Sequence, residues 1–287
     1  MSASAAHPIL PPLDGDPQPV LVVAHLTKRF LTAEGPLVAV DDVSLDVRRG
    51  EFVSLIGPSG CGKSTLFNIV GGLIDDYDGE VTVDGQAVNG PHRSIGMVFQ
   101  EESTFPWRTT LENVAFPLEA AGVGKSERLT RARELVKLVG LEGFENRYPA
   151  EMSGGMRQRT AIARTLAFEP KILLMDEPFA ALDEQTRLLL GDKVLQIKDA
   201  LNQTTLLITH NIAEAVQLSD RVVVMSYRPG RVKRIIAIDL PRPRTSEIVG
   251  SAEFGGYVAN IWADLREEAA KGLSESEAVG AARGTRR

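Results

Sequence analysis

The sequence has one cysteine, Cys61, among its 287 residues, so an internal disulfide is excluded and a reducing compartment such as the cytoplasm is favoured. Basic residues are also few, because 32 Lys and Arg stand against 38 Asp and Glu and give a formal net charge of -6. Proteins that grip nucleic acid over a broad surface usually carry a strong basic excess. Binding to nucleic acid is therefore not expected.

Long apolar runs are missing as well. The longest runs, such as Val222 to Met225, suit single buried strands and fall far short of the roughly 18 apolar residues that a membrane-spanning helix needs. We therefore do not expect the chain to cross a bilayer by itself. The start of the chain lacks the basic region and apolar block of a secretory signal, and its Pro, Ala and Asp content predicts a disordered leader over residues 1–19.

The length suits one large α/β domain, or one such domain with a smaller lobe inserted in it. Between residues 20 and 56 the apolar pattern predicts strands, the last of them at Phe52–Ile56, and a glycine-rich turn follows. A helix is predicted at Leu66–Leu73, and further strands at Glu80–Val83 and Ile95–Phe99.

The pattern changes to helical spacing between Leu111 and Gly140, with Ser126 as a candidate N-cap, and this predicts a helical subdomain. Beyond Met152 helices and strands alternate, which implies a mostly parallel sheet with helices on its faces. The expected elements there are helix Ser153–Phe168, strand Ile172–Asp176, helix Glu184–Leu201, strand Thr205–Ile208, helix Ile212–Leu218 and strand Arg221–Met225.

A last strand is expected near Val232–Ile238, and the Pro241-Arg242-Pro243 stretch ends the main domain. We see no internal repeat, so the chain holds one copy of this domain. The expected organisation is a main domain over residues 20–244, with a helical subdomain inserted at about 101–168. Residues 245–287 are expected to form one more helix followed by a frayed tail.

A phosphate-binding loop of the Walker A type lies between a predicted strand and a predicted helix. Its glycines allow the backbone to approach a phosphate closely, and successive N–H groups at a helix start attract anions. We expect Lys63 to reach the β- and γ-phosphates and the Ser64 hydroxyl to ligate Mg²⁺. The backbone of Cys61 should matter to phosphate, whereas its side chain fills the loop. The loop consists of Gly57, Pro58, Ser59, Gly60, Cys61, Gly62, Lys63, Ser64 and Thr65.

Two carboxylates end a buried strand of the Walker B type, Ile172 to Asp176. Asp176 at the strand tip is placed to hold Mg²⁺ through water, and Glu177 just after it is placed to accept a proton from the attacking water. A strand followed by a solvated acidic turn would explain this pair in isolation. Its position after the Walker A loop in the chain favours the catalytic interpretation.

The chain resembles the ATP-binding cassette (ABC) ATPases, because the stretch from Met152 to Arg159 looks like the signature sequence of that family. The resemblance implies a P-loop NTPase core with a mixed sheet, an N-terminal antiparallel β subdomain and an inserted helical subdomain. It also implies that the signature completes the ATP site of a second copy, so that two ATP molecules lie between two head-to-tail domains. The signature residues assigned to this site in trans are Ser153, Gly154, Gly155 and Gln158. Met152 departs from the leucine usual in the family, with similar apolar volume.

Four further positions match the family one by one. Gln100 resembles the Q-loop glutamine that touches Mg²⁺ and the attacking water, and Asp183 resembles the aspartate of the D-loop. His210 resembles the switch histidine that contacts the γ-phosphate, and Phe30 resembles the aromatic residue that stacks on adenine. The resemblance thus assigns Glu177, His210 and Gln100 to catalysis and Ser64, Gln100 and Asp176 to Mg²⁺. A core role for Phe30 and a plain loop role for His210 are the alternatives.

A single cassette without a membrane span implies separate membrane permease subunits as partners. The stretch Pro106-Trp107-Arg108-Thr109 resembles the nitrate, sulfonate and taurine importer cassettes, as do Arg228 to Arg231 and Asp239 to Arg244. The resemblance implies a peripheral position on the cytoplasmic face of the bacterial inner membrane and indirect cooperation with a solute-binding protein. Trp107 as a buried anchor is the alternative to a docking role. Two other functions compete with this one. The chain could be a mechanoenzyme acting on nucleic acid or ribosomes, or an ATP-binding scaffold without turnover.

Overall fold

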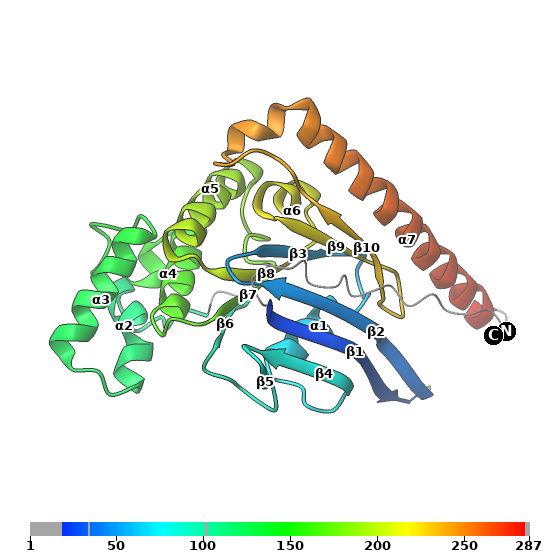
Figure 1. Cartoon of the computed structure of the whole chain (residues 1–287), viewed down its shortest axis with the longest axis horizontal. Coiled ribbons are helices and arrows are strands. Elements are labelled where there is room, and N and C mark those ends of the chain that lie inside the picture. The colour runs from blue at the N-terminus through cyan, green and yellow to red at the C-terminus, as the bar shows by residue number, and fades with distance from the viewer. Residues whose placement is uncertain (1–18, 34, 101–102, 285–287) are drawn as a thin grey trace.

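The computed structural model describes residues 19–33, 35–100 and 103–284, and the chain folds around two β-sheets (Figure 1). The first sheet is antiparallel and has the strand order β2-β1-β4-β5. It confirms the antiparallel β subdomain expected near the N-terminus. Its strands are β1 (Pro19–Thr32), β2 (Gly35–Arg48), β4 (Asp78–Val83) and β5 (Gln86–Ala87).

The second sheet is mixed and has the order β10-β9-β3-β8-β7-β6. The five strands from β9 to β6 are parallel, and β10 joins the edge antiparallel to β9. β3 and β8 are buried along their whole length, which explains why they are apolar runs without alternation. The strands are β3 (Phe52–Ile56), β6 (Ile95–Val98), β7 (Ile172–Asp176), β8 (Thr204–Thr209), β9 (Arg221–Met225) and β10 (Val232–Ala237).

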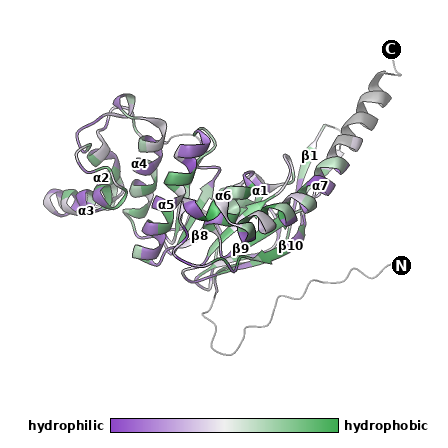
Figure 2. Ribbon diagram, turned by 90° about the horizontal axis from the view of Figure 1, so that it is seen from above, coloured by the Kyte–Doolittle hydropathy of each residue, from purple (hydrophilic) through white to green (hydrophobic). Residues whose placement is uncertain are grey.

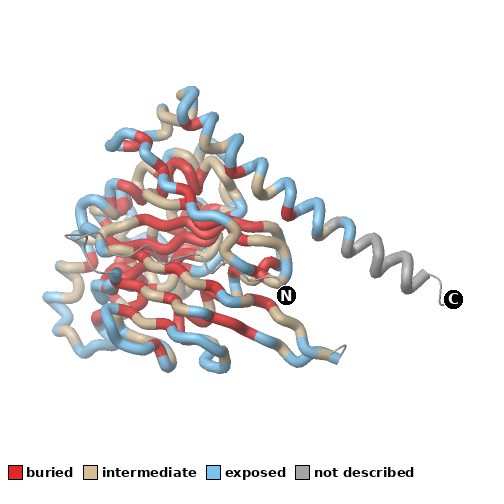
Figure 3. The backbone as a smooth tube through the Cα atoms, turned by 45° about the vertical axis from the view of Figure 1, so that its right-hand side comes forward, coloured by how far each residue is buried: buried red, intermediate tan, exposed pale blue. Residues whose placement is uncertain are grey.

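Helix α1 (Lys63–Val70) lies between the two sheets and joins them in one apolar core (Figure 1). Leu66, Phe67 and Ile69 of this helix are buried there. Helices α5 (Glu184–Leu201) and α6 (Ile212–Leu218) cover the other face of the mixed sheet. The buried strands run through the middle of the molecule (Figure 3), so the sheet edges and their loops are left to carry chemistry.

The helical subdomain packs against one side of the sheets (Figures 1 and 2). It holds α2 (Thr110–Ala120), α3 (Lys125–Leu138), a short 3-10 helix (Pro149–Glu151) and α4 (Gly154–Leu166). The predicted N-cap at Ser126 is wrong. The residue before α3 is Gly124, whose extended backbone (φ -55°, ψ 146°) lets the helix begin at Lys125, so Ser126 lies inside the first turn.

After β10 the chain forms a 3-10 helix (Ser246–Gly250) and then α7 (Ala252–Gly284), which runs along the mixed sheet and beyond it (Figure 2). The frayed tail expected from the sequence falls mostly on α7, and residues 285–287 lie outside the described part. So do residues 1–18 of the expected leader and residues 101–102. The domain boundaries remain predictions. Within the described ranges, no helix has both the length and the apolar character to span a bilayer.

Candidate nucleotide-binding site

A cavity of about 380 Å³ opens where the glycine-rich loop leaves β3. Because β3 and β9 are parallel neighbours, their C-terminal ends meet at this edge of the sheet. The first strands of the antiparallel sheet supply the opposite wall. The residues that line the cavity are Phe30, Leu37, Ala39, Ser59, Gly60, Gly62, Lys63, Ser64, Thr65, Glu177 and Arg228.

The glycine-rich loop has a conformation that only glycine accepts at two points. Gly60 and Gly62 have φ of 75° and 96°. A Cβ on Gly62 would also lie 2.6 Å from the carbonyl oxygen of Ala39, so the neighbouring strand closes over the loop at this residue. The chain then enters α1 at Lys63, whose free helix N-terminus favours an anion in the cavity.

Lys63 is buried and held beside the loop it follows. Its Nζ donates to the carbonyl oxygens of Gly57 at 2.8 Å and Pro58 at 3.0 Å. The side chain of Cys61 is buried, and burial raises the pKa of its thiol, so the side chain stays neutral. This agrees with a filling role for the side chain of Cys61. Within the loop, the residues from Ser59 to Thr65 other than Cys61 line the cavity, whereas Gly57, Pro58 and Cys61 do not.

Asp176 ends β7 and Glu177 follows it, and of these two carboxylates Glu177 is the one that lines the cavity. Glu177 has a left-handed backbone (φ 43°), fixed by its N–H bond to the Ile208 carbonyl at 2.8 Å, and its side chain lines the cavity. Its Oε2 lies 3.0 Å from Nδ1 of His210. Burial, together with the charge of Glu177, raises the pKa of Asp176, while Lys63 opposes that shift. A cation beside these carboxylates would therefore be stabilised.

His210 is carried by a tightly bonded turn between β8 and α6. The Thr209 hydroxyl donates to Glu214 Oε2 at 2.5 Å and accepts the Asn211 N–H at 3.0 Å, and Asn211 caps α6. Glu214 is 7% exposed, and burial raises its pKa to about 7. Glu214 could not be singled out from the sequence, because a glutamate in a short helix is usually a surface residue.

The other residues assigned from the sequence lie away from the cavity. Ser153 is exposed at the start of α4 and caps it by accepting the Met156 N–H, with Gly154 and Gly155 in the first turn. Gln158 is 3% exposed, so its side chain does not face a partner in this structure. Asp183 caps α5 by accepting the Thr186 N–H at 2.9 Å, and Gln100 is exposed. Among the described residues, none from α4 reaches the cavity of its own chain.

A Mg²⁺ ion fits the oxygen atoms at this site only together with a phosphate ligand. Ser64 offers a hydroxyl and Asp176 a carboxylate, the hard oxygen ligands that Mg²⁺ prefers. In the parts of the chain that the structure covers, Asp176 has no ion pair, and no group of three or more His, Cys, Asp or Glu side chains could hold a metal. The remaining ligands must therefore come from water and substrate.

Three cavity residues were not assigned to the nucleotide site from the sequence. Leu37 and Ala39 alternate along β2 and give an apolar wall near Phe30, which the strand alternation could have indicated. Arg228 follows β9, far from the glycine-rich loop in sequence. Only the parallel pairing of β3 with β9 places it at the cavity.

An aromatic cluster, made of Phe105, Trp107 and Phe116, lies after the Gln100 segment. Phe105 packs on Phe116 and Trp107 with ring centroids 4.7 Å and 5.6 Å away. Asn113 fixes the backbone beneath it, accepting the Phe105 N–H at 2.7 Å and donating to the Arg108 carbonyl at 2.9 Å. Trp107 is 70% exposed, so the alternative in which it is a buried anchor is wrong.

Known proteins that this chain resembles in sequence include ATP-binding proteins of transporters. A family model described as ABC transporter matches residues 40–180. An uncharacterised ABC transporter ATP-binding protein of Methanocaldococcus jannaschii is 49% identical over 88% of this chain and 94% of its own. The nitrate import ATP-binding protein NrtD of Synechocystis is 42% identical over 90% and 98% of the two chains. The aliphatic sulfonates import ATP-binding protein SsuB of Bacillus cereus is 39% identical over 82% and 97%.

Solved structures agree with these relatives. A dimeric ATP-binding cassette in a post-hydrolysis state, bound to ADP and Pi, has a TM-score of 0.67 and 36% identity, covering 77% of this chain and all of its own. A cassette of the cbiONQ complex from Clostridium perfringens has a TM-score of 0.69 and 27% identity, covering 76% and 88%. The expected P-loop ABC fold is thereby confirmed.

Proposed function

The chain belongs to the ATP-binding subunits of ABC transporters, and from this membership we propose how its residues hydrolyse ATP and which importer they serve. It is an ATPase subunit of an ABC importer. The observation that carries the residue assignments is one cavity with the phosphate-binding loop on one side and Glu177, 3.0 Å from His210, on the other.

ATP enters this cavity with its phosphates on the glycine-rich loop. The backbone N–H groups at the start of α1 and the ammonium group of Lys63 bind the β- and γ-phosphates. Phe30, with Leu37 behind it, gives the adenine an apolar face to stack on. Phosphate and base are thus held at opposite ends of the same cavity.

Hydrolysis needs a base that faces the γ-phosphate. Glu177 lines the cavity and accepts the proton of the attacking water, and His210 holds the Glu177 carboxylate in place while contacting the γ-phosphate. Ser64, Asp176 and Gln100 would hold a Mg²⁺ ion, which would neutralise charge on the phosphates when bound. The strained backbone at Glu177 fixes the direction of the carboxylate before substrate arrives.

A second copy of the chain completes each site. The exposed helix start at Ser153, with its hydroxyl and the N–H groups of Gly154 and Gly155, suits the γ-phosphate held by a partner copy. The dimeric form of a similar cassette supports this arrangement. ATP therefore lies between the two copies, and its binding favours the closed dimer.

The membrane partners dock on the aromatic cluster of Phe105, Trp107 and Phe116. Exposed aromatic residues on a fixed backbone are typical anchors of an interface, and Arg164 of α4 donates to the backbone and hydroxyl of Ser103 at 2.6 Å each. The segment is thereby tied to the helix that begins at Ser153. Closure of the dimer moves the two together and transmits ATP binding to the permease.

The importer works at the cytoplasmic face of the bacterial inner membrane and carries a small solute of the nitrate, sulfonate or taurine class. The similarity to NrtD and SsuB supports this solute class, and a solute-binding protein delivers the solute to the permease. Function on nucleic acid receives no support from these relatives or from the net charge of -6.

The residue assignment is tested by Glu177→Gln in the purified subunit. A general base contributes about 10²- to 10⁴-fold to the rate, so turnover should fall by at least about 10²-fold while ATP still binds. Glu169→Gln is a matched control, because Glu169 also has a left-handed backbone but is exposed and lies outside the cavity. Equal ATPase rates in the two variants would refute the role of Glu177.

A further inference from the structure

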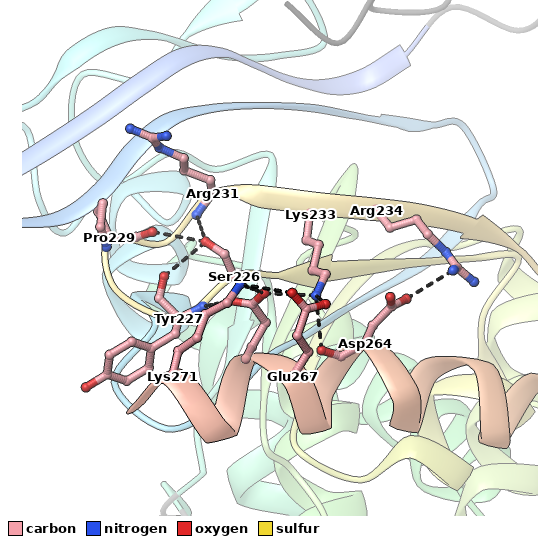
Figure 4. Close-up of polar contacts among 10 residues, drawn as sticks. Ser226, Tyr227, Pro229, Arg231, Lys233, Arg234, Asp264, Glu267 and Lys271 are labelled. Atoms are coloured by element: carbon pink, nitrogen blue, oxygen red, sulfur yellow. Dashed lines mark hydrogen bonds and ion pairs between the residues drawn. The ribbon is translucent and has the colours of Figure 1, made fainter. Parts of the chain in front are cut away.

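The loop between β9 and β10 is held in one conformation by its own hydrogen bonds (Figure 4). We call Ser226 to Arg231 the Arg228 loop. The Ser226 N–H donates to the Arg231 carbonyl at 2.9 Å, and the Ser226 hydroxyl donates to the Pro229 carbonyl at 3.0 Å while accepting the Arg231 N–H at 3.0 Å. These bonds close the loop on itself and hold its backbone in one conformation. They thereby fix the directions in which its side chains leave the backbone.

The same loop is locked against the back of the phosphate-binding loop. The Gly230 N–H donates to the Ala39 carbonyl at 3.0 Å, and the Gly230 carbonyl accepts the Asp41 N–H at 2.9 Å. A Cβ on Gly230 would lie 1.9 Å from the carbonyl oxygen of Cys61, so the two loops are in direct backbone contact. A shift of the Arg228 loop therefore cannot occur without moving the phosphate-binding loop or β2.

Arg228 points from this loop into the nucleotide cavity. It lines the cavity, and its Nη2 would lie 3.1 Å from a Cβ on Gly60. Among the residues the structure covers, Arg228 has no hydrogen bond or ion pair, whereas the nearby Arg231 pairs with Asp41 and Arg234 with Asp264. A guanidinium has a planar set of N–H donors that matches phosphate oxygens. Arg228 is thus a second cation beside Lys63 at the phosphate end of the cavity.

Helix α7 holds the other side of the Arg228 loop (Figure 4). Glu268 of this helix is 2% exposed and accepts the Tyr227 N–H at 2.8 Å, next to Arg228 in the chain. Lys233 and Lys271 bind Glu268 Oε1 at 2.9 Å and 2.7 Å. These hydrogen bonds outweigh burial and lower the pKa of Glu268 to about 2, so it is charged at neutral pH.

We propose that Arg228 is an additional contact to the phosphates of the bound nucleotide, and that Glu268 of α7 is the positioning residue that holds the Arg228 loop against the phosphate-binding loop. The proposal rests on the assignment of the cavity as the ATP site. It gives the C-terminal helix a part in nucleotide affinity, because α7 fixes the residue next to Arg228. None of the sequence motifs assigns a nucleotide contact to either residue.

The phosphate contact is tested with Arg228→Gln, using ATP, ADP and adenosine as ligands. Loss of a charge-assisted hydrogen bond should weaken ATP binding about tenfold, raise KM for ATP equally and leave kcat within about twofold, with adenosine unaffected. Equal weakening of ATP and ADP places the contact on the α- or β-phosphate, and weakening of ATP alone places it on the γ-phosphate. Arg29→Gln is the control, because Arg29 is an exposed cation near Phe30 that pairs with Asp78 outside the cavity.

The failure of this proposal can be separated from failure of the site itself. If Arg228→Gln binds ATP within about twofold of wild type while Lys63→Ala loses binding, the Arg228 contact is refuted and the ATP site stands. If Lys63→Ala also binds normally, the cavity is not the ATP site and both proposals fall.

The positioning role is tested with Glu268→Ala against Glu267→Ala. Glu267 is a neighbour on α7 that pairs with Lys233 and Lys271 but is exposed, and the Tyr227 N–H donates to Glu268 instead. We expect Glu268→Ala alone to raise KM for ATP without lowering kcat, and to have no further effect in the Arg228→Gln background. Glu268→Gln keeps an oxygen for the Tyr227 N–H and should restore KM. The positioning role of Glu268 would be overturned by a lower melting temperature with unchanged KM in Glu268→Ala. It would also be overturned by additive effects on KM in the Glu268→Ala, Arg228→Gln double variant.

Discussion

Glu214 should make the stability of the fold depend on pH near neutrality. Burial raises its pKa from about 4.5 to about 7, and the groups that face it are Thr209 and His210 on the adjoining turn, Arg187 on α5, and Glu177. The Thr209 hydroxyl, Arg187 and His210 oppose the shift, and Glu177 adds to it. Glu214 Oε1 has no hydrogen-bond partner among the described residues, so the neutral form fits this environment better than the charged form.

The direction follows from the raised pKa. The folded protein holds the proton more tightly than the unfolded chain, so this contribution to stability is complete below about pH 4.5 and is lost as the pH rises through about 7. A difference of about 2.5 pKa units at 1.36 kcal/mol each corresponds to about 3 kcal/mol at most. Between pH 5 and pH 8, the wild type should therefore lose about 2 to 3 kcal/mol relative to Glu214→Gln, which does not titrate.

The assay is chemical unfolding of the wild type and Glu214→Gln at several values of pH from 5 to 8. Contributions from other titrating groups largely cancel when the two free energies of unfolding are subtracted. Thr209→Val is a second check, because it removes the hydroxyl that lowers the pKa of Glu214 and should extend the pH-dependent range upward. If the difference between wild type and Glu214→Gln stays constant to about 0.5 kcal/mol over this range, Glu214 does not couple stability to pH near neutrality.

Three further variants test the site and its surroundings. Gly62→Ala should weaken ATP binding by more than about tenfold, because its Cβ would meet the Ala39 carbonyl at 2.6 Å. Gly85→Ala is the control, because Gly85 has a similar positive φ but open space around it, so the change should cost about 1 kcal/mol of stability and leave KM for ATP unchanged. Equal KM values in Gly62→Ala and Gly85→Ala would contradict the steric role of Gly62. Trp107→Ala should keep its melting temperature and ATPase rate yet fail to bind permease-containing membranes, and normal recruitment would remove the docking assignment. Asp176→Asn should raise the Mg²⁺ concentration for half-maximal ATPase by at least about tenfold, and an unchanged Mg²⁺ titration would exclude Asp176 as a ligand.

The elements that the sequence predicted best are buried strands and a helix with a clear apolar face. Phe52–Ile56, Ile172–Asp176 and Glu184–Leu201 have the same bounds in the structure as in the pattern. Parallel strands buried on both faces are short apolar runs, and the helices between them carry caps such as Asp183. The start of α3 was misplaced because the extended backbone of Gly124 competes with the side-chain signal of Ser126.

The residues of the candidate site also differ in how far the sequence predicted them. The phosphate-binding loop and Glu177 are local motifs, so their place at one cavity followed from the order of strand, loop and helix. Arg228 and Glu268 depend on contacts between segments distant in the chain, which the sequence pattern does not contain. Their positions come from the pairing of β9 with β3 and from the packing of α7 on the Arg228 loop.

We propose that ATP joins two copies of this chain, each supplying the phosphate-binding loop for one nucleotide and the Ser153 helix start for the other. Sedimentation velocity of Glu177→Gln with ATP and Mg²⁺ tests this dimer, since the variant is expected to bind ATP without turning it over. We expect a monomer without ATP, a dimer with ATP, and no dimer when Ser153→Arg is added, because Ser153 is exposed and the arginine side chain would fill the interface. A Glu177→Gln protein that stays monomeric with ATP at high concentration, or dimerises equally well with Ser153→Arg, would contradict it.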